Sequence, residues 1–320
     1  MIMSLILDLP LLAVAYGRKN SMEKFPKKST EFIVSEHSAN IPKGKPIEKY
    51  PELTEEGVRL AQERAEDFAK TIEGAEPGTV FWFGGNSYIP RTRSTLEVYS
   101  DTLHKRFAGA ETDDTILISK KDIKEAAKEG YSKAIASLVE KANQHPDAKI
   151  IIDLPLQIKQ ISQKDWYIVD GRLKQYQEEL IKKYDLFSRY GENFSNATRE
   201  WFTQPDTREG REKTPNPEEI AKSYLEGLNR LKEFVRKHFP DRPLKIAVVG
   251  HSFELNALLT YLANNGHIDK EGFEKIGGTT IGFTEPAIIE IEDNKIKTTY
   301  RDKSFEFENL NAEEQVKKDE

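Results

Sequence analysis

Two histidines and an arginine each follow an apolar run that is typical of a buried strand. His37 ends the stretch Phe-Ile-Val-Ser-Glu-His, His251 ends Ile-Ala-Val-Val-Gly-His, and Arg91 comes a few residues after Val-Phe-Trp-Phe-Gly-Gly. An imidazole can act as a nucleophile or a base, and a guanidinium binds oxyanions through paired donors. Because the carboxyl ends of parallel strands meet at one edge of a sheet, we expect these three side chains to share one crevice.

Ser252 competes with His251 for the reactive role, because both residues stand at the same strand-to-helix turn. The sequence Gly250-His-Ser-Phe-Glu254 resembles the G-x-S-x-G elbow of serine hydrolases, but Glu254 replaces the last glycine. The expected order of triad partners also fails, since His267 is the only later histidine and follows very soon. An α/β serine hydrolase is therefore kept only as a remote alternative.

The elements that would position these residues alternate between strands and helices. Apolar, β-rich runs predict strands at Glu31–Ser35, Thr79–Phe83, Thr115–Ile118, Lys149–Ile152, Leu244–Val249, Ala287–Ile291 and Lys295–Tyr300. Amphipathic periodicity predicts helices that begin at Thr54, which is a good N-cap, and at Pro217. This alternation predicts an α/β fold with a doubly wound, mostly parallel sheet flanked by helices.

The domain organisation follows from where strands and helices alternate along the chain. We expect an N-terminal extension over residues 1–30, a single α/β domain over 31–308 and a disordered tail over 309–320. Residues 155–214 interrupt the pattern, because they are rich in charged and aromatic residues and show one helical stripe, from Leu173 to Phe187. They are interpreted as a helical insertion.

Composition excludes several classes of function. The 320 residues contain no cysteine, which excludes disulfides, thiolate catalysis and cysteine-ligated zinc. The 48 basic and 54 acidic residues give a net charge of −6, spread along the chain, which argues against a nucleic-acid partner. The apolar N-terminus is short and is interrupted by Asp8 and Pro10, so no membrane partner is expected and a cytoplasmic location is favoured. The oligomeric state is left open.

Four segments in order resemble the histidine phosphatase superfamily, the phosphoglycerate-mutase-like fold. They are the strand-end His37, the stretch LTEEGVRLAQERA, the loop and helix NSYIPRTRSTLE, and VVGHS followed by a helix. The resemblance covers roughly residues 30–130 and 215–300. It implies a phosphoryl-transfer site that needs no metal or cofactor, in which a histidine attacks phosphorus and forms a phosphohistidine.

The resemblance also implies roles for particular residues. His37 would be the nucleophile, with Arg91 and, when it is protonated, His251 as donors to the phosphoryl oxygens. The remaining expected contacts to substrate come from Glu36, Ser38, Asn86, Ser87, Ser252 and Glu254, together with backbone N–H groups of the Gly84–Asn86 loop. The acid that protonates the leaving oxygen is expected after the Thr115–Ile118 strand, with Glu125 as first choice and Asp122, Glu129 or Glu254 as the other candidates.

One departure stands out, because the family has Arg-His-Gly where this chain has Glu36-His37-Ser38. A carboxylate then stands where an arginine would clamp phosphate, and like charges about 4 Å apart repel by roughly 4 kcal/mol at an effective dielectric of 20. Three accommodations are open: Glu36 turns away, Lys43, Lys45 or Arg93 replaces the lost charge, or Glu36 itself donates the proton.

The sequence therefore predicts a metal-independent phosphohydrolase that acts on a small phosphomonoester. A mutase is less expected. The alternative from another class is a catalytically inactive, phosphatase-like binding or scaffold protein, in which Glu36 disables the pocket.

Overall fold

A single mixed sheet forms the centre of the computed structural model, which describes residues 30–39, 48–85, 89–107, 114–119, 121–157, 178–180, 182–185, 190–203, 216–292 and 295–308. Within these ranges the sheet has 8 strands in the order β3-β4-β2-β5-β1-β6-β7-β8. The pairs from β3 to β1 are parallel, and the pairs from β1 to β8 are antiparallel. The predicted α/β fold class with a largely parallel sheet is confirmed.

The strands have the bounds β1 Thr30–Glu36, β2 Val80–Gly85, β3 Thr115–Ser119, β4 Lys149–Gln157, β5 Leu244–Gly250, β6 Pro286–Ile291, β7 Lys295–Tyr300 and β8 Lys303–Glu308. β5 lies between β1 and β2, with Glu36 opposite Gly250 and Gly85 opposite Val249. The carboxyl ends of these three strands are therefore side by side at the same edge of the sheet.

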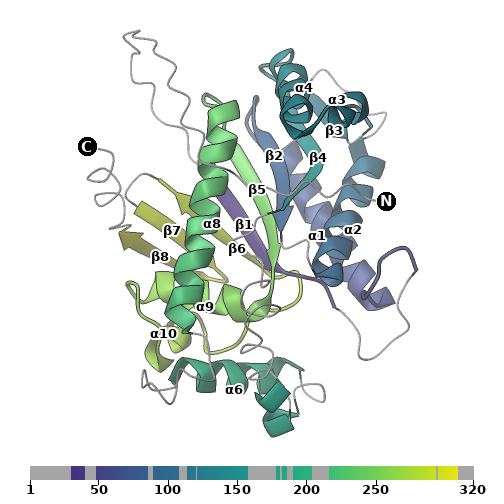
Figure 1. Cartoon of the computed structure of the whole chain (residues 1–320). Coiled ribbons are helices and arrows are strands. Elements are labelled where there is room, and N and C mark those ends of the chain that lie inside the picture. Colours follow the sequence, from purple (N-terminus) through teal and green to yellow (C-terminus); the bar gives the residue numbers. More distant parts are fainter. Residues whose placement is uncertain are drawn as a thin grey trace.

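Helices cover both faces of the sheet (Figure 1). One face packs on α1 (Glu55–Glu73) and α2 (Pro90–Phe107) through a cluster that includes Ile33, Phe81 and Val249. The other face packs on the remaining helices, which are α3 (Lys124–Lys128), α4 (Tyr131–Asn143), α6 (Tyr190–Thr203), α8 (Pro217–His238), α9 (Ser252–Ala263) and α10 (Lys270–Lys275). Successive residues of a strand point to opposite faces, so continuous apolar runs are the pattern that a sheet covered on both sides requires.

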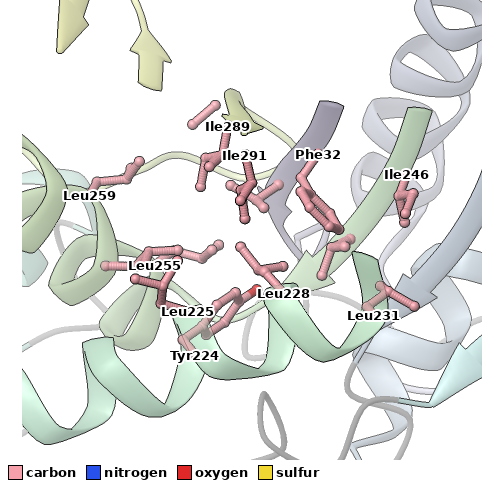
Figure 2. Close-up of a cluster of buried hydrophobic side chains, with 14 of the residues drawn as sticks. Phe32, Tyr224, Leu225, Leu228, Leu231, Ile246, Leu255, Leu259, Ile289 and Ile291 are labelled. Carbon is pink, nitrogen blue, oxygen red and sulfur yellow. The ribbon is translucent and has the colours of Figure 1, made fainter. Parts of the chain in front are cut away.

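The core under α8 shows how the two layers meet (Figure 2). Leu228 and Leu231 of α8 point toward Phe32 of β1 and Ile246 of β5, and all four side chains are buried. Burial of each such side chain contributes about 1.5–3 kcal/mol, so α8 is fixed firmly on β1 and β5. This packing fixes α8 against the two strands that lead to His37 and His251.

The structure differs from the sequence interpretation in three places. β4 runs to Gln157, so the expected insertion begins later than residue 155. β8 was not predicted as a strand, although its Phe305 and Phe307 pack against the core in alternation with exposed residues. Within the insertion, α6 is an additional helix, and only residues 178–180 and 182–185 of the predicted helical stripe are described.

Most of the N-terminal extension and the predicted C-terminal tail lie outside the described residues. None of the helices in the described part of the chain is long and apolar enough to cross a membrane.

Candidate active site

His37 follows β1 directly, and its backbone N–H donates to the carbonyl of Gly250 at 3.1 Å, which extends the β1–β5 pairing by one residue. Its Nδ1 lies 2.8 Å from the carbonyl oxygen of Ser38. Because a carbonyl can only accept, Nδ1 carries the proton and Nε2 carries the lone pair. Burial, and then the nearby Arg91, lower the pKa of His37 to about 3. The imidazole is therefore neutral at pH 7, which is the form that can attack an electrophile.

Arg91, the second residue of α2, lies directly on that lone pair. Its Nε donates to Nε2 of His37 at 2.8 Å. One further hydrogen bond ties the start of α2 to the segment after β1, since the N–H of Ser38 donates to Thr95 Oγ1 at 2.9 Å. Within α2, Thr95 Oγ1 in turn donates to the Arg91 carbonyl at 2.9 Å. The guanidinium and Nε2 of His37 are thus held in contact by the Ser38–Thr95 hydrogen bond as well as by their own.

His251 brings a second imidazole to the same place. Its ring centroid is 5.0 Å from that of His37, with an interplanar angle of 66°. Its Nε2 lies 3.4 Å from Oγ1 of Thr92, the residue that follows Arg91. Burial comes first, and Arg91 and His37 add to it, in lowering the pKa of His251 well below its usual value. Both imidazoles are therefore uncharged at neutral pH, so the expectation of a protonated His251 as a phosphate donor is wrong for this structure, because burial and Arg91 disfavour its charged form.

The start of α2 and the start of α9 converge at this pair of rings. Thr92 lies in the first turn of α2, and His251 is the N-cap residue of α9, so their 3.4 Å contact brings the two helix ends together. The N-terminus of a helix carries a partial positive charge and N–H groups without partners in the helix, which favour a bound anion. With the Arg91 guanidinium added, this corner of the sheet is suited to an oxyanion.

Two buried carboxyl groups oppose that preference. Glu36 is only 1% exposed, and its Oε1 lies 3.8 Å from Nε2 of His37. Glu254, in the first turn of α9, is also buried. Burial and then the charge of Glu254 raise the pKa of Tyr224, which lies across from it on α8. Glu36 therefore does not turn away from His37, and the Arg91 guanidinium shares the site with carboxyl groups.

Close packing of backbone segments fixes the residues after His37. Ser38 Oγ donates to the carbonyl of Gly57 at 2.5 Å, and the N–H of Thr54 donates to the carbonyl of Ala39 at 3.3 Å. A Cβ at Gly57 would lie 2.0 Å from the oxygen of Ala39. The first turn of α1 therefore packs tightly against the segment that follows His37 and requires glycine at position 57.

The acids expected after β3 are not brought to this site. Glu125 lies on α3, exposed, with Lys128 Nζ 2.7 Å from its Oε1. Asp122 accepts from Ser119, and Glu129 is exposed with Lys133 Nζ 3.8 Å away. The reason is topological, because β4 lies between β3 and β2 and moves β3 to the edge of the sheet. Four strand spacings, about 19 Å, then separate β3 from β1.

The other predicted contacts have mixed outcomes. Ser38 and Ser252 are buried and directly follow His37 and His251, and Glu254 is buried in the first turn of α9. Asn86, Ser87, Lys43 and Lys45 lie outside the described residues. Arg93 is half-buried on α2. His267, the later partner that a Ser252 triad would need, is 76% exposed and 3.8 Å from Glu218. No group of three His, Asp or Glu side chains in the described ranges is arranged to hold a metal ion.

The sequence interpretation missed two residues that contact this site. Thr92 lies against His251, and Glu52 Oε2 lies 3.7 Å from Nη1 of Arg91. Thr92 was within reach of sequence reasoning, because it follows Arg91 in the predicted first turn of a helix. Glu52 gave no signal, since an acidic residue between a proline and a leucine is an ordinary surface pattern.

No protein-family model matches the chain, and no curated protein matches it. It is similar to solved structures that include phosphoglycerate mutase from Bacillus anthracis, at 11% identity and a TM-score of 0.37 over 86% of this chain and 93% of that chain. A protein assigned as an alpha-ribazole-5'-phosphate phosphatase from Escherichia coli gives 12% identity and a TM-score of 0.38, over 85% and 95%. The product of an open reading frame of Mycobacterium tuberculosis gives 7% identity and a TM-score of 0.35, over 84% and 95%. Scores this low carry no argument about activity, so the case for a function rests on the site itself.

Proposed function

We propose that this protein hydrolyses a small phosphomonoester without a metal ion, through a phosphohistidine at His37. The observation that carries the proposal is the state of the His37 ring. Its Nδ1 proton is held by the Ser38 carbonyl at 2.8 Å, and its Nε2 lone pair meets the Arg91 guanidinium at 2.8 Å. A neutral nucleophile beside a forked cation is the arrangement that phosphoryl transfer requires, because catalysis of this reaction is mainly positioning and charge stabilisation.

The reaction has two steps. In the first, Nε2 of His37 forms a bond to phosphorus while the bond from phosphorus to the ester oxygen breaks, and the leaving oxygen takes a proton from a carboxylic acid. In the second, water attacks phosphorus, the Nε2–phosphorus bond breaks, and the water's proton returns to the same carboxylate. Arg91 and the helix N-termini that meet beside His251 stabilise the phosphoryl oxygens in both steps.

Glu36 is our first candidate for the acid. It is buried, its Oε1 lies 3.8 Å from the attacking nitrogen, and it can serve as the acid once it has taken up a proton on substrate binding. Glu254 is the second candidate, because it is buried in the first turn of the helix that His251 caps. Glu125 is disfavoured by its exposed position on α3.

Glu36 also favours a second candidate function, a phosphatase-like binding protein without catalysis. A charged carboxylate 3.8 Å from Nε2 repels a phosphoryl group, and the Arg91 contact covers the lone pair that must attack. Such a protein would keep the fold and bind a ligand of lower negative charge at the same place.

Hydrolysis of an aryl phosphate in the presence of a chelator separates these possibilities. The phosphohydrolase predicts activity in the wild type that is lost in His37→Ala and retained in Ser252→Ala. If the wild type does not hydrolyse the aryl phosphate and Glu36→Arg does, the result supports the binding protein. Activity that survives His37→Ala and is lost in Ser252→Ala contradicts the phosphohistidine mechanism and supports the serine hydrolase.

A further inference from the structure

Glu52 has a backbone conformation that is unusual for its residue type. Its φ is 69°, in the left-handed region that residues other than glycine seldom adopt. The conformation costs free energy, and such residues are found preferentially at functional sites. In this turn the conformation directs a carboxylate toward Arg91, because Glu52 Oε2 lies 3.7 Å from Nη1 of Arg91.

The turn that carries Glu52 is fixed to the helix that carries Arg91. The Tyr50 hydroxyl donates to Oδ2 of Asp101 at 2.7 Å, and the Ser94 hydroxyl donates to the Pro51 carbonyl at 2.7 Å. Asp101 and Ser94 both belong to α2, so the two residues that precede Glu52 are bound to that helix. The backbone that leads into Glu52 is therefore fixed relative to the helix that carries Arg91.

Arg91 is consequently held at two points of its guanidinium. Nε donates to the lone pair of His37, and Nη1 faces Glu52. An oxyanion that binds Arg91 with the usual paired geometry needs two of its N–H groups, and both the histidine and the carboxylate compete for them. An oxyanion that binds through Nε and Nη2 displaces His37 and releases its lone pair, whereas one that binds through Nη1 and Nη2 competes with Glu52.

We propose that Glu52 is a positioning residue that keeps Arg91 on His37 until an anion takes its place, and so sets the anion affinity of the site. The inference rests on the proposed function only in that the site takes an oxyanion, and it concerns binding rather than turnover. Glu52 does not contact the reacting atoms in this scheme. It acts through Arg91.

The test compares Glu52→Gln with the wild type and with Glu48→Gln, an exposed acid of the same turn that removes the same charge. Inorganic phosphate is titrated into each protein by calorimetry at low ionic strength. Exposed ion pairs contribute up to about 1 kcal/mol, so Glu52→Gln is expected to bind phosphate about fivefold more tightly, and Glu48→Gln is expected to match the wild type. The gain should shrink as salt is added.

A second readout reports on the contact itself. In ¹⁵N spectra of the histidine rings without phosphate, the Nε2 signal of His37 should move in Glu52→Gln toward that of a nitrogen without a hydrogen bond, and should stay in place in Glu48→Gln. Phosphate binding that is equal in all three proteins, with an unmoved His37 signal, overturns the role of Glu52 and leaves the proposed function standing. Failure of all three to bind phosphate overturns the proposed function, and the inference with it.

Discussion

The substitution Glu36→Gln tests the electrostatics of the site most sharply, because it removes a buried charge and keeps the shape of the side chain. Glu36 Oε1 lies 3.8 Å from Nε2 of His37, and a reacting phosphorus atom stands about 3–3.5 Å from its nucleophile. A separation of about 4 Å between the carboxylate and the phosphoryl group corresponds to roughly 4 kcal/mol of repulsion at an effective dielectric of 20. Even half of that value is a change of about thirtyfold in affinity, since each 1.4 kcal/mol is tenfold.

Calorimetric titration with inorganic phosphate should therefore show a dissociation constant at least about thirtyfold lower in Glu36→Gln than in the wild type. The matched control is Glu31→Gln, which removes the same charge from the other end of β1, where Glu31 pairs with Lys245 at 2.7 Å. Glu31 lies five residues, or about 17 Å, along the strand, so its removal should change the affinity by less than twofold. Equal affinities in the wild type and Glu36→Gln would refute the electrostatic reasoning.

Three further predictions concern stability. The pKa of His37 is lowered to about 3, so the unfolded chain takes up a proton that the folded protein refuses as the pH falls from about 6.5 toward 3. In urea denaturation, the free energy of unfolding of the wild type should fall by about 2 kcal/mol more than that of His37→Asn between pH 6.5 and pH 4.5. Equal losses in the two proteins would contradict a buried, neutral His37 ring. Gly57→Ala should destabilise the fold by about 1–3 kcal/mol, because its Cβ would lie 2.0 Å from the Ala39 oxygen. In the control Gly74→Ala the new Cβ would lie 3.4 Å from its nearest neighbour, so the thermal unfolding temperature should be unchanged or slightly raised. Arg242 is buried and donates hydrogen bonds to the carbonyls of Gly78, Ala142 and Ala148. Arg242→Ala should lower the free energy of unfolding by about 3 kcal/mol or more, and a loss below about 1 kcal/mol would contradict a stabilising role for these bonds.

The layered fold and the meeting of the three reactive segments follow from rules that a sequence carries. Continuous apolar runs such as Ile246–Val249 require cover on both faces, and parallel strands bring their carboxyl ends to one edge. Those rules are sufficient to place His37, Arg91 and His251 near one another. The roles of these residues stay predictions until chemistry tests them.

Strand order and backbone conformation are not carried by the same rules. β4 is later in the chain than β3 yet lies between β3 and β2, and this exchange moves Glu125 to the edge of the molecule. β8 was missed although Phe305 and Phe307 alternate with acidic residues, because a short polar run after a turn is equally typical of a frayed end. Glu52 was missed because its φ of 69° depends on hydrogen bonds to α2 that only the folded chain makes.

The central claim is that His37 takes the phosphoryl group, and the most direct measurement is the site of phosphorylation in the intact protein. The protein is mixed with an aryl phosphate, quenched in alkali, which preserves phosphohistidine, and analysed by ³¹P NMR and peptide mass spectrometry. The account predicts phosphorus on Nε2 of His37, absent from His37→Ala. Hydrolysis that proceeds with no phosphoryl group on His37, or with one on another residue, would contradict it.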